Sequence, residues 1–259
     1  MQRKGARLGQ HFLKHGWAAK KLAYAAAPRE GEAIIEIGPG KGVLTKELLA
    51  LGSVIAIEKD ELLVEKLKET FEAEIKSARL TLVAGDVRDF KPETYNLKPG
   101  TYLVAANIPY YITGEIIRQF LTAQVQPRAM ALLVQKEVAD RIVDTKESIL
   151  SISVKAYGTP KMIAKVGKSH FSPPPSVDSA ILLIDDISKN FFADISEEKF
   201  FALVRAGFAS KRKMLLNNLS GMFEREILHD AFQKCSLSAK IRAENVSLDQ
   251  WRRLVQALV

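Results

Sequence analysis

The most constraining feature of this sequence is a short apolar run that leads directly into a glycine-rich turn and then into a helix pattern. Residues 33–37 (AIIEI) suit a buried strand, residues 38–42 (GPGKG) follow, and residues 43–51 have helical periodicity that Gly52 ends. Glycines here let the backbone approach a ligand at the start of a helix. The segment therefore predicts a strand, a ligand-binding turn and a helix, as in an open α/β sheet.

The same alternation continues through most of the chain and favours a doubly wound, mostly parallel sheet. Further strands are expected at residues 54–57, 80–83, 102–107 and 129–133, and apolar runs near 149–156, 162–166 and 180–184 complete a sheet of about seven strands. Helices are expected at residues 17–27, 62–74, 112–121 and 136–143.

From about residue 186 only helical periodicity remains. Helices are expected at residues 197–209, 211–223, 225–234 and 248–258, with Ser196 and Ser247 as N-caps. The chain is therefore predicted to have an α/β domain at residues 1–185 and a small all-α domain at residues 186–259.

The composition is that of a soluble globular protein, with 47% hydrophobic and 26% charged residues among 259. No apolar run approaches the ~20 residues of a membrane span, so we expect a cytoplasmic protein with no membrane partner. One cysteine, Cys235, and four histidines without metal-ligand spacing predict no disulfide and no metal site. We see no clear exposed apolar helix stripe, which favours a monomer. The net charge of +8 favours a polyanionic partner, most simply nucleic acid.

Three acidic residues stand at the expected strand ends around the glycine turn. Glu36 precedes the turn, Glu58 lies 20 residues after Gly38 and suits two ribose hydroxyls, and Asp86 could accept a hydrogen bond from an adenine amino group. Glu36 would repel a pyrophosphate, and Val43 breaks the dinucleotide-binding pattern. Each acid alone could be a solvated turn residue, but the three together favour a cationic nucleoside such as S-adenosylmethionine.

The tetrapeptide Asn107-Ile108-Pro109-Tyr110 follows the fourth expected strand, at the sheet edge where such folds bind ligands. The Asn107 side-chain oxygen and the Ile108 carbonyl could accept hydrogens from the exocyclic amine of an adenine, and Tyr110 could stack on the base. The same residues also suit an ordinary strand-to-helix turn. The adenine amine is a weak nucleophile. Catalysis by this tetrapeptide would therefore consist mostly of positioning a base that has been flipped out of its stack.

Four segments together resemble the rRNA adenine N6-dimethyltransferases, and most of all the branch that acts on small-subunit rRNA. They are LGQHFL (8–13), EIGPGKG (36–42), NIPY (107–110) and FSPPPSVDS (171–179), and QKEVADR (135–141) and RAENV (242–246) also match. The resemblance covers nearly the whole chain. It implies a Rossmann-like class I methyltransferase that uses S-adenosylmethionine to dimethylate two adjacent adenosines in a hairpin near the 3′ end of small-subunit rRNA, on the assembling 30S subunit.

The resemblance also implies roles for individual residues. Cofactor contacts are implied at His11, Leu13, Gly38, Gly40, Glu58, Asp86 and Asn107. Base handling is implied for Asn107, Pro109, Tyr110 and Phe171, with Phe171 stacking on the adenine opposite Tyr110; alternatively, Phe171 anchors the proline-rich loop. RNA contacts are expected from Arg3, Lys4, Arg7, Arg205, Lys211, Arg212 and Lys213, although each could belong to a solvated basic surface.

Two departures from the family pattern stand out. The family often has Asn where this chain has His11, and residues 144–150 replace a glycine-containing loop whose KAYG sequence comes later here, at 155–158. Two alternative functions remain open: a resistance-type methyltransferase that acts on large-subunit rRNA, and a non-catalytic RNA- or DNA-binding assembly or transcription factor. The segment FSPPPSVDS disfavours the first, and the complete NIPY and acidic set disfavour the second.

Overall fold

The computed structural model describes residues 11–14 and 16–259. The described chain divides into two compact units. The sheet unit contains the residues up to Asp140 and Gly158–Ser188, and the helical unit contains Arg141–Tyr157 and Lys189–Val259. The expected single boundary at residues 185/186 differs from this division, because residues 141–157 pack with the C-terminal helices. None of the described helices is long and apolar enough to cross a membrane.

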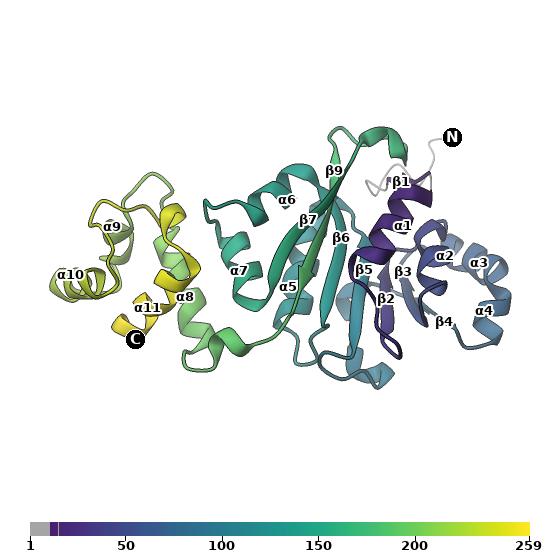
Figure 1. Ribbon diagram of the computed structural model, residues 1–259, viewed down its shortest axis with the longest axis horizontal. Coiled ribbons are helices and arrows are strands. Elements are labelled where there is room, and N and C mark those ends of the chain that lie inside the picture. Colours follow the sequence, from purple (N-terminus) through teal and green to yellow (C-terminus); the bar gives the residue numbers. More distant parts are fainter. Residues whose placement is uncertain (1–10, 15) are drawn as a thin grey trace. The chain divides into compact units, whose positions relative to one another are not determined.

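The sheet unit is built on seven strands in the order β4-β3-β2-β5-β6-β9-β7 (Figure 1). Strands β2 to β6 are parallel, whereas β9 runs antiparallel to both β6 and β7. The strands are β2 (Ala33–Ile37), β3 (Val54–Glu58), β4 (Leu80–Ala84), β5 (Tyr102–Asn107), β6 (Ala129–Gln135), β7 (Thr159–Val166) and β9 (Ser179–Asp185). The predicted seven-stranded, mostly parallel sheet is confirmed.

Helices cover the sheet, and a two-stranded sheet closes its ligand-binding edge. Helices α1 and α2 pack against each other on one face, where small and branched side chains of α1 fill the core (Figure 1). Strand β1 (Phe12–Leu13) pairs with β8 (Phe171–Ser172). The helices are α1 (Gly16–Ala25), α2 (Val43–Leu49), α3 (Glu61–Thr70), α4 (Glu72–Lys76), α5 (Thr113–Thr122) and α6 (Lys136–Val143), the last of which spans the division between the units.

The helical unit consists of α7 (Ile149–Tyr157), α8 (Glu197–Gly207), α9 (Leu215–Leu219), α10 (Arg225–Lys234) and α11 (Leu248–Leu258). Its core is a separate apolar cluster around the fully buried Trp251 and Phe200, and it includes the free thiol of Cys235. The Ser196 and Ser247 side chains cap α8 and α11, as predicted. The unit is therefore held by its own hydrophobic core.

Two predictions in this region are wrong. Residues 149–156 form helix α7 and not a strand: their alternation suggests period two, but Ile152 and Ala156 lie one helical turn apart and both enter the helical core. The helix expected at residues 211–223 is only α9, because Asn218 donates hydrogen bonds to the Gly207 and Ser210 carbonyls and holds the preceding segment in a turn.

Arg128 connects three segments at the start of β6. Its guanidinium donates to both carboxylate oxygens of Glu32 (2.6 and 2.9 Å), to the Ala26 and Ala27 carbonyls (3.0 and 3.2 Å), and to Asp185 (3.3 Å). The Arg128 and Glu32 side chains are only 10% and 8% exposed. The pair fixes the end of α1 at the sheet edge opposite the glycine turn, and it lowers the pKa of Glu32 mainly through the hydrogen bond from Arg128.

Candidate active site

A crevice opens between the carboxyl ends of β2 and β5, where the strand order reverses. Strand β2 pairs with β3 on one side and β5 on the other, so the chain leaves β2 and β5 toward opposite faces of the sheet. Gly38, Gly40 and Gly42 all have positive φ, between 60° and 78°. A Cβ on Gly40 would lie 2.8 Å from the Phe12 ring, so the turn requires glycine both for its backbone and for its close approach to β1.

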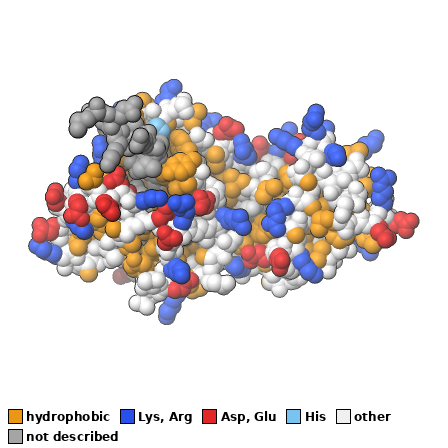
Figure 2. Space-filling view, turned by 180° about the vertical axis from the view of Figure 1, so that it is seen from behind, with side chains coloured by type: hydrophobic (Ala, Val, Ile, Leu, Met, Phe, Trp, Pro, Cys, Tyr) orange, Lys and Arg blue, Asp and Glu red, His pale blue; other side chains and the backbone are white. Residues whose placement is uncertain are grey.

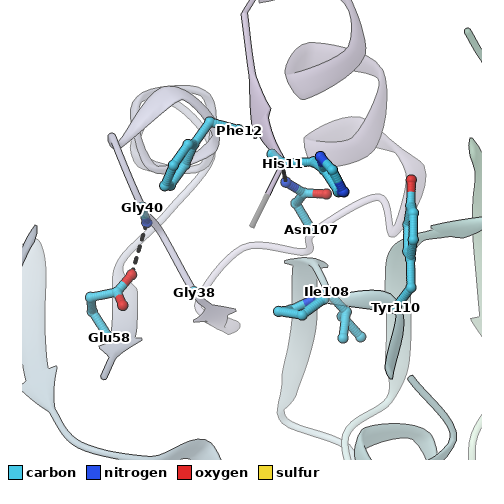
Figure 3. A pocket seen from close by; sticks show the side chains of 9 residues that line it. His11, Phe12, Gly38, Gly40, Glu58, Asn107, Ile108 and Tyr110 are labelled. Atoms are coloured by element: carbon cyan, nitrogen blue, oxygen red, sulfur yellow. Dashed lines mark hydrogen bonds between the residues drawn. The ribbon is translucent and has the colours of Figure 1, made fainter. Parts of the chain in front are cut away.

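Glu58 fixes the glycine turn from the end of β3. Its carboxylate accepts the Gly40 N–H at 3.0 Å and the Asp60 N–H at 2.9 Å, and the residue is 3% exposed. Figure 3 shows Glu58 and Gly40 on one side of the pocket, with His11, Asn107 and Tyr110 on the other. Each carboxylate oxygen keeps a lone pair for a further donor, such as a ribose hydroxyl.

Glu36 is buried at the end of β2 without a hydrogen-bond partner of standard geometry among the described residues. It is 1% exposed, both carboxylate oxygens are unpaired, and the neighbouring Thr45 hydroxyl is unpaired too. Burial raises the pKa of Glu36 to about 8, and the negative charge of Glu58 adds to the rise, while the nearby Thr45 opposes it. A buried carboxyl with free acceptors is suited to a cationic ligand.

Asp86, after β4, lies on the wall of a larger cavity of about 290 Å³ beside Glu58. Side chains of Ile37, Ile57 and Val87 give this cavity apolar walls suited to a planar base. The Asp86 carboxylate is held by Lys59 at 2.8 Å and by Arg88, whose Nε lies at 3.0 Å. The hydrogen bond from Arg88 is the main cause of a strongly lowered Asp86 pKa.

Asn107 is oriented by the backbone of the β1 segment. Its Nδ2 donates to the His11 carbonyl at 2.9 Å, which leaves Oδ1 as an acceptor on the side of the pocket that faces Tyr110 (Figure 3). Since a carbonyl can only accept, this contact fixes which end of the amide faces the pocket. His11 Nδ1 donates to the Pro173 carbonyl at 2.9 Å, so the ring is tied to the proline-rich loop.

Tyr110 stands at the mouth of the same pocket. Its hydroxyl shares a hydrogen bond of 2.7 Å with the Ser179 hydroxyl, and its ring centroid lies 5.9 Å from that of His11. Burial is the main reason that the Tyr110 pKa is raised. The tyrosine is therefore a neutral, fixed aromatic wall, and Pro109 and Ile108 complete the lining.

Phe171 does not face this pocket. It is fully buried in the sheet unit's core, where its backbone pairs with Leu13. Its stacking on a base stays a prediction that this geometry does not support, whereas its alternative role as an anchor of the proline-rich loop agrees with the burial. Phe12, which the sequence did not single out, lines the pocket instead, next to Gly40, and Lys41 lies over its ring at 5.3 Å.

The structure brings together the other expected cofactor residues. His11, Gly38, Gly40, Glu58 and Asn107 line one pocket, Leu13 lines an adjoining one with Glu36, and Asp86 lines the apolar cavity next to Glu58. Lys59 at Asp86 and Ser179 at Tyr110 were missed, because neighbours that are distant in the chain leave no local sequence signal. Arg88 lies only two residues after Asp86 and was missed although it is a local neighbour. No group of three or more potential metal ligands occurs among residues 11–14 and 16–259.

The expected RNA contacts fall in two places. Arg3, Lys4 and Arg7 lie outside the described residues. Arg205, Lys211, Arg212 and Lys213 are exposed in the helical unit, where Lys211 and Lys213 line a groove of about 570 Å³ together with Arg141 and Lys146. Lys and Arg side chains are numerous on the face of this unit seen in Figure 2. The same groove is also lined by Asp144, Glu147 and Glu244, so its cations outnumber its acids by only one.

The geometry fits S-adenosylmethionine in three respects. Glu36 offers an unpaired buried carboxyl where a cationic amino-acid end would lie, Glu58 offers free lone pairs for ribose, and the cavity beside Asp86 has the apolar walls of a base site. Asn107 and Tyr110 then face the remaining opening, where a second base could enter. The arrangement is suited to methyl transfer onto a base amine.

Comparison with known proteins gives the family. The model of the ribosomal RNA adenine dimethylase family matches residues 1–259. A relative from Dehalococcoides mccartyi, named ribosomal RNA small subunit methyltransferase A, is 38% identical over 97% of this chain and 87% of its own length.

Two solved structures share the fold. A dimethyladenosine transferase from Plasmodium falciparum has a TM-score of 0.82 and 25% identity, covering 95% of this chain and 96% of that one. The 23S rRNA methyltransferase ErmE, with a TM-score of 0.78, 24% identity and coverage of 95% and 99%, is similar in fold alone. The full-length match shows that this chain belongs to the ribosomal RNA adenine dimethylase family and uses S-adenosylmethionine.

Proposed function

We propose that this enzyme dimethylates the N6 amines of two adjacent adenosines in the hairpin near the 3′ end of small-subunit rRNA, on the assembling 30S subunit. The observation that carries the proposal is the Asn107 amide, fixed with its oxygen toward the pocket opening beside Tyr110. The relatives are named ribosomal RNA small subunit methyltransferase A, which supports the choice of the small subunit.

The methyl group on the cofactor's sulfonium supplies the electrophile. In the first transfer the Asn107 oxygen and the Ile108 carbonyl would accept the two amine hydrogens, which would orient the nitrogen lone pair toward the cofactor's methyl group. In the second transfer the methylated amine would donate its one remaining hydrogen to one of these two acceptors. Tyr110 stacks on the extruded adenine and is itself fixed by Ser179. No side chain is required to abstract a proton before transfer. The new nitrogen–carbon bond would form as the carbon–sulfur bond breaks and leaves a neutral thioether, and the methylated nitrogen would then release one proton to solvent.

The helical unit contributes sequence-independent contacts in this proposal. Lys211 and Lys213, with Lys146 on the same groove, pair with RNA phosphates, while Arg205 and Arg212 extend the basic surface. Such contacts hold the RNA in register and leave selection of the target base to the pocket. We propose that the protein acts as a monomer in the cytoplasm.

The test is incubation of the protein with radiolabelled cofactor and with separate 30S and 50S particles that lack the modification. Label in small-subunit RNA, released as N6,N6-dimethyladenosine on digestion, is the expected result. Label confined to large-subunit RNA would overturn the proposal in favour of the resistance-type activity. RNA binding without any methyl transfer would support the non-catalytic alternative.

A further inference from the structure

The exposed face of α1 carries an unusual set of side chains for the surface of a soluble protein. Trp17, Lys20, Lys21 and Tyr24 point outward, while the intervening alanines and Leu22 are buried. Both aromatic residues are 52% exposed. They lie seven residues apart on one helix face, which corresponds to about 10 Å along the helix axis.

A lysine lies near one of the two rings and a histidine near the other. Lys20 Nζ lies 6.0 Å from the centre of the Tyr24 ring, and the His170 ring lies 5.6 Å from that of Trp17. Lys14 and Lys168 are exposed beside His170, whose carbonyl accepts the Lys14 N–H at 2.8 Å. We call the set Lys14, Trp17, Lys20, Lys21, Tyr24, Lys168 and His170 the α1 patch.

Little negative charge opposes the α1 patch. Within residues 11–14 and 16–259, Lys14, Lys20, Lys21 and Lys168 form no ion pair with a carboxylate. Two acids lie close to this surface: Asp178 accepts the Lys168 backbone N–H, and a Cβ on Gly16 would lie 3.7 Å from a Glu47 carboxylate oxygen. Exposed aromatic faces among unpaired cations are the combination that binds single-stranded nucleic acid, because bases stack on the rings and phosphates pair with the lysines.

The α1 patch is also continuous with the active site. Lys14 directly follows Leu13, which lines the pocket beside Glu36, and His11 lines the pocket of Asn107. His170 directly precedes Phe171 in β8, the partner of β1. An RNA strand that leaves the Asn107 pocket and passes over β1 would therefore reach Trp17 after a few nucleotides.

We propose that the α1 patch binds an unpaired RNA segment that flanks the target adenosine, with bases stacked on Trp17 and Tyr24 and phosphates paired with Lys20 and Lys21. Stacked nucleotides rise about 3.4 Å per step, so the two rings suit bases about three steps apart. The proposal rests on the proposed action on RNA and adds a second contact surface in the sheet unit, distinct from the basic groove of the helical unit.

The tryptophans provide a direct readout, because Trp17 is half exposed whereas Trp251 is fully buried in the helical unit. Titration with an unpaired single-stranded RNA that has no self-complementary sequence should quench the fluorescence of the wild-type protein but not that of Trp17→Phe. An RNA duplex of the same length should quench much less. Quenching by anionic lipid vesicles with none by RNA would overturn the proposal in favour of a membrane surface.

Affinity provides the second test. Stacking contributes about 1–3 kcal/mol per base, so Trp17→Ala with Tyr24→Ala, which removes two stacking faces, should weaken single-stranded RNA binding about thirtyfold or more. Lys20→Glu with Lys21→Glu should also weaken binding, whereas the matched reversal Lys66→Glu with Lys68→Glu on α3 should not. If the wild type and all α1 variants bind single-stranded RNA equally well and 30S methylation is intact, the proposal for the α1 patch is refuted and the proposed function is unaffected. Absence of methylation by the wild type would instead refute the proposed function.

Discussion

Glu36 should make the stability of the ligand-free protein fall as the pH rises. Its pKa is raised from an ordinary value near 4.5 to about 8, mainly by burial. Between these two pH values the folded state holds a proton that the unfolded chain has lost, so raising the pH favours unfolding. At about 1.4 kcal/mol per pKa unit, the full loss between pH 4.5 and 8 is about 5 kcal/mol at most.

The substitution Glu36→Gln removes the ionisable carboxyl group and keeps the size and shape of the side chain. At pH 5 the stabilities of the variant and the wild type should differ by no more than about 1 kcal/mol, because this pH is only slightly above the ordinary pKa of 4.5 and most of the loss occurs at higher pH. At pH 8.5 the variant should be more stable by several kcal/mol. Urea unfolding followed by circular dichroism at pH 5, 7 and 8.5 measures the difference, with the exposed Glu69→Gln on α3 as the control. Parallel pH profiles of wild type and Glu36→Gln would refute the reasoning.

The same carboxyl should link cofactor binding to proton release. A cationic ligand favours the ionised form of Glu36, so binding at pH 7 should release a proton from the wild type and none from Glu36→Gln. Calorimetric titration with S-adenosylmethionine in two buffers of different ionisation enthalpy counts the protons. A buffer-independent binding enthalpy for the wild type would contradict this link.

Other substitutions test the remaining parts of the structure. Asn107→Ala and Tyr110→Ala should each reduce methyl transfer at least a hundredfold with RNA affinity, measured by filter binding, nearly unchanged; full activity of Asn107→Ala would rule out the assigned mechanism. Asp86→Asn should raise the KM for the cofactor more than it lowers kcat, because the residue lines only the base cavity; steady-state kinetics distinguishes the two. Arg128→Leu should cost about 3–5 kcal/mol of unfolding free energy in urea, since it leaves a buried carboxylate unpaired. Gly207→Ala should destabilise the helical unit by about 1–3 kcal/mol, because its Cβ would overlap the Trp251 ring, and the loss should be visible by calorimetry.

Local patterns were enough to predict much of the fold. Runs such as 33–37 and 102–107 are apolar except for Glu36 and Asn107 near their carboxyl ends, because strands of a parallel sheet are covered on both faces, and glycines with positive φ follow the first of them. The caps at Ser196 and Ser247 depend on residues three positions apart and were equally predictable. Residues 149–156 were misassigned because alternating apolar residues are compatible with either period, and contact with the helical core decides between them.

The sequence by itself determined the strand-end chemistry of the site. Glu36, Glu58, Asp86 and Asn107 could be placed at one sheet edge because successive parallel strands end there. Only the tertiary structure decided what each group contacts. It left Glu36 unpaired in the interior, tied Asp86 to two cations, turned the Asn107 amide toward the pocket, and buried Phe171. Apart from the contact between Asp86 and Arg88, which is local, these outcomes depend on residues far apart in the chain, and a local sequence pattern holds no record of which distant side chains will meet.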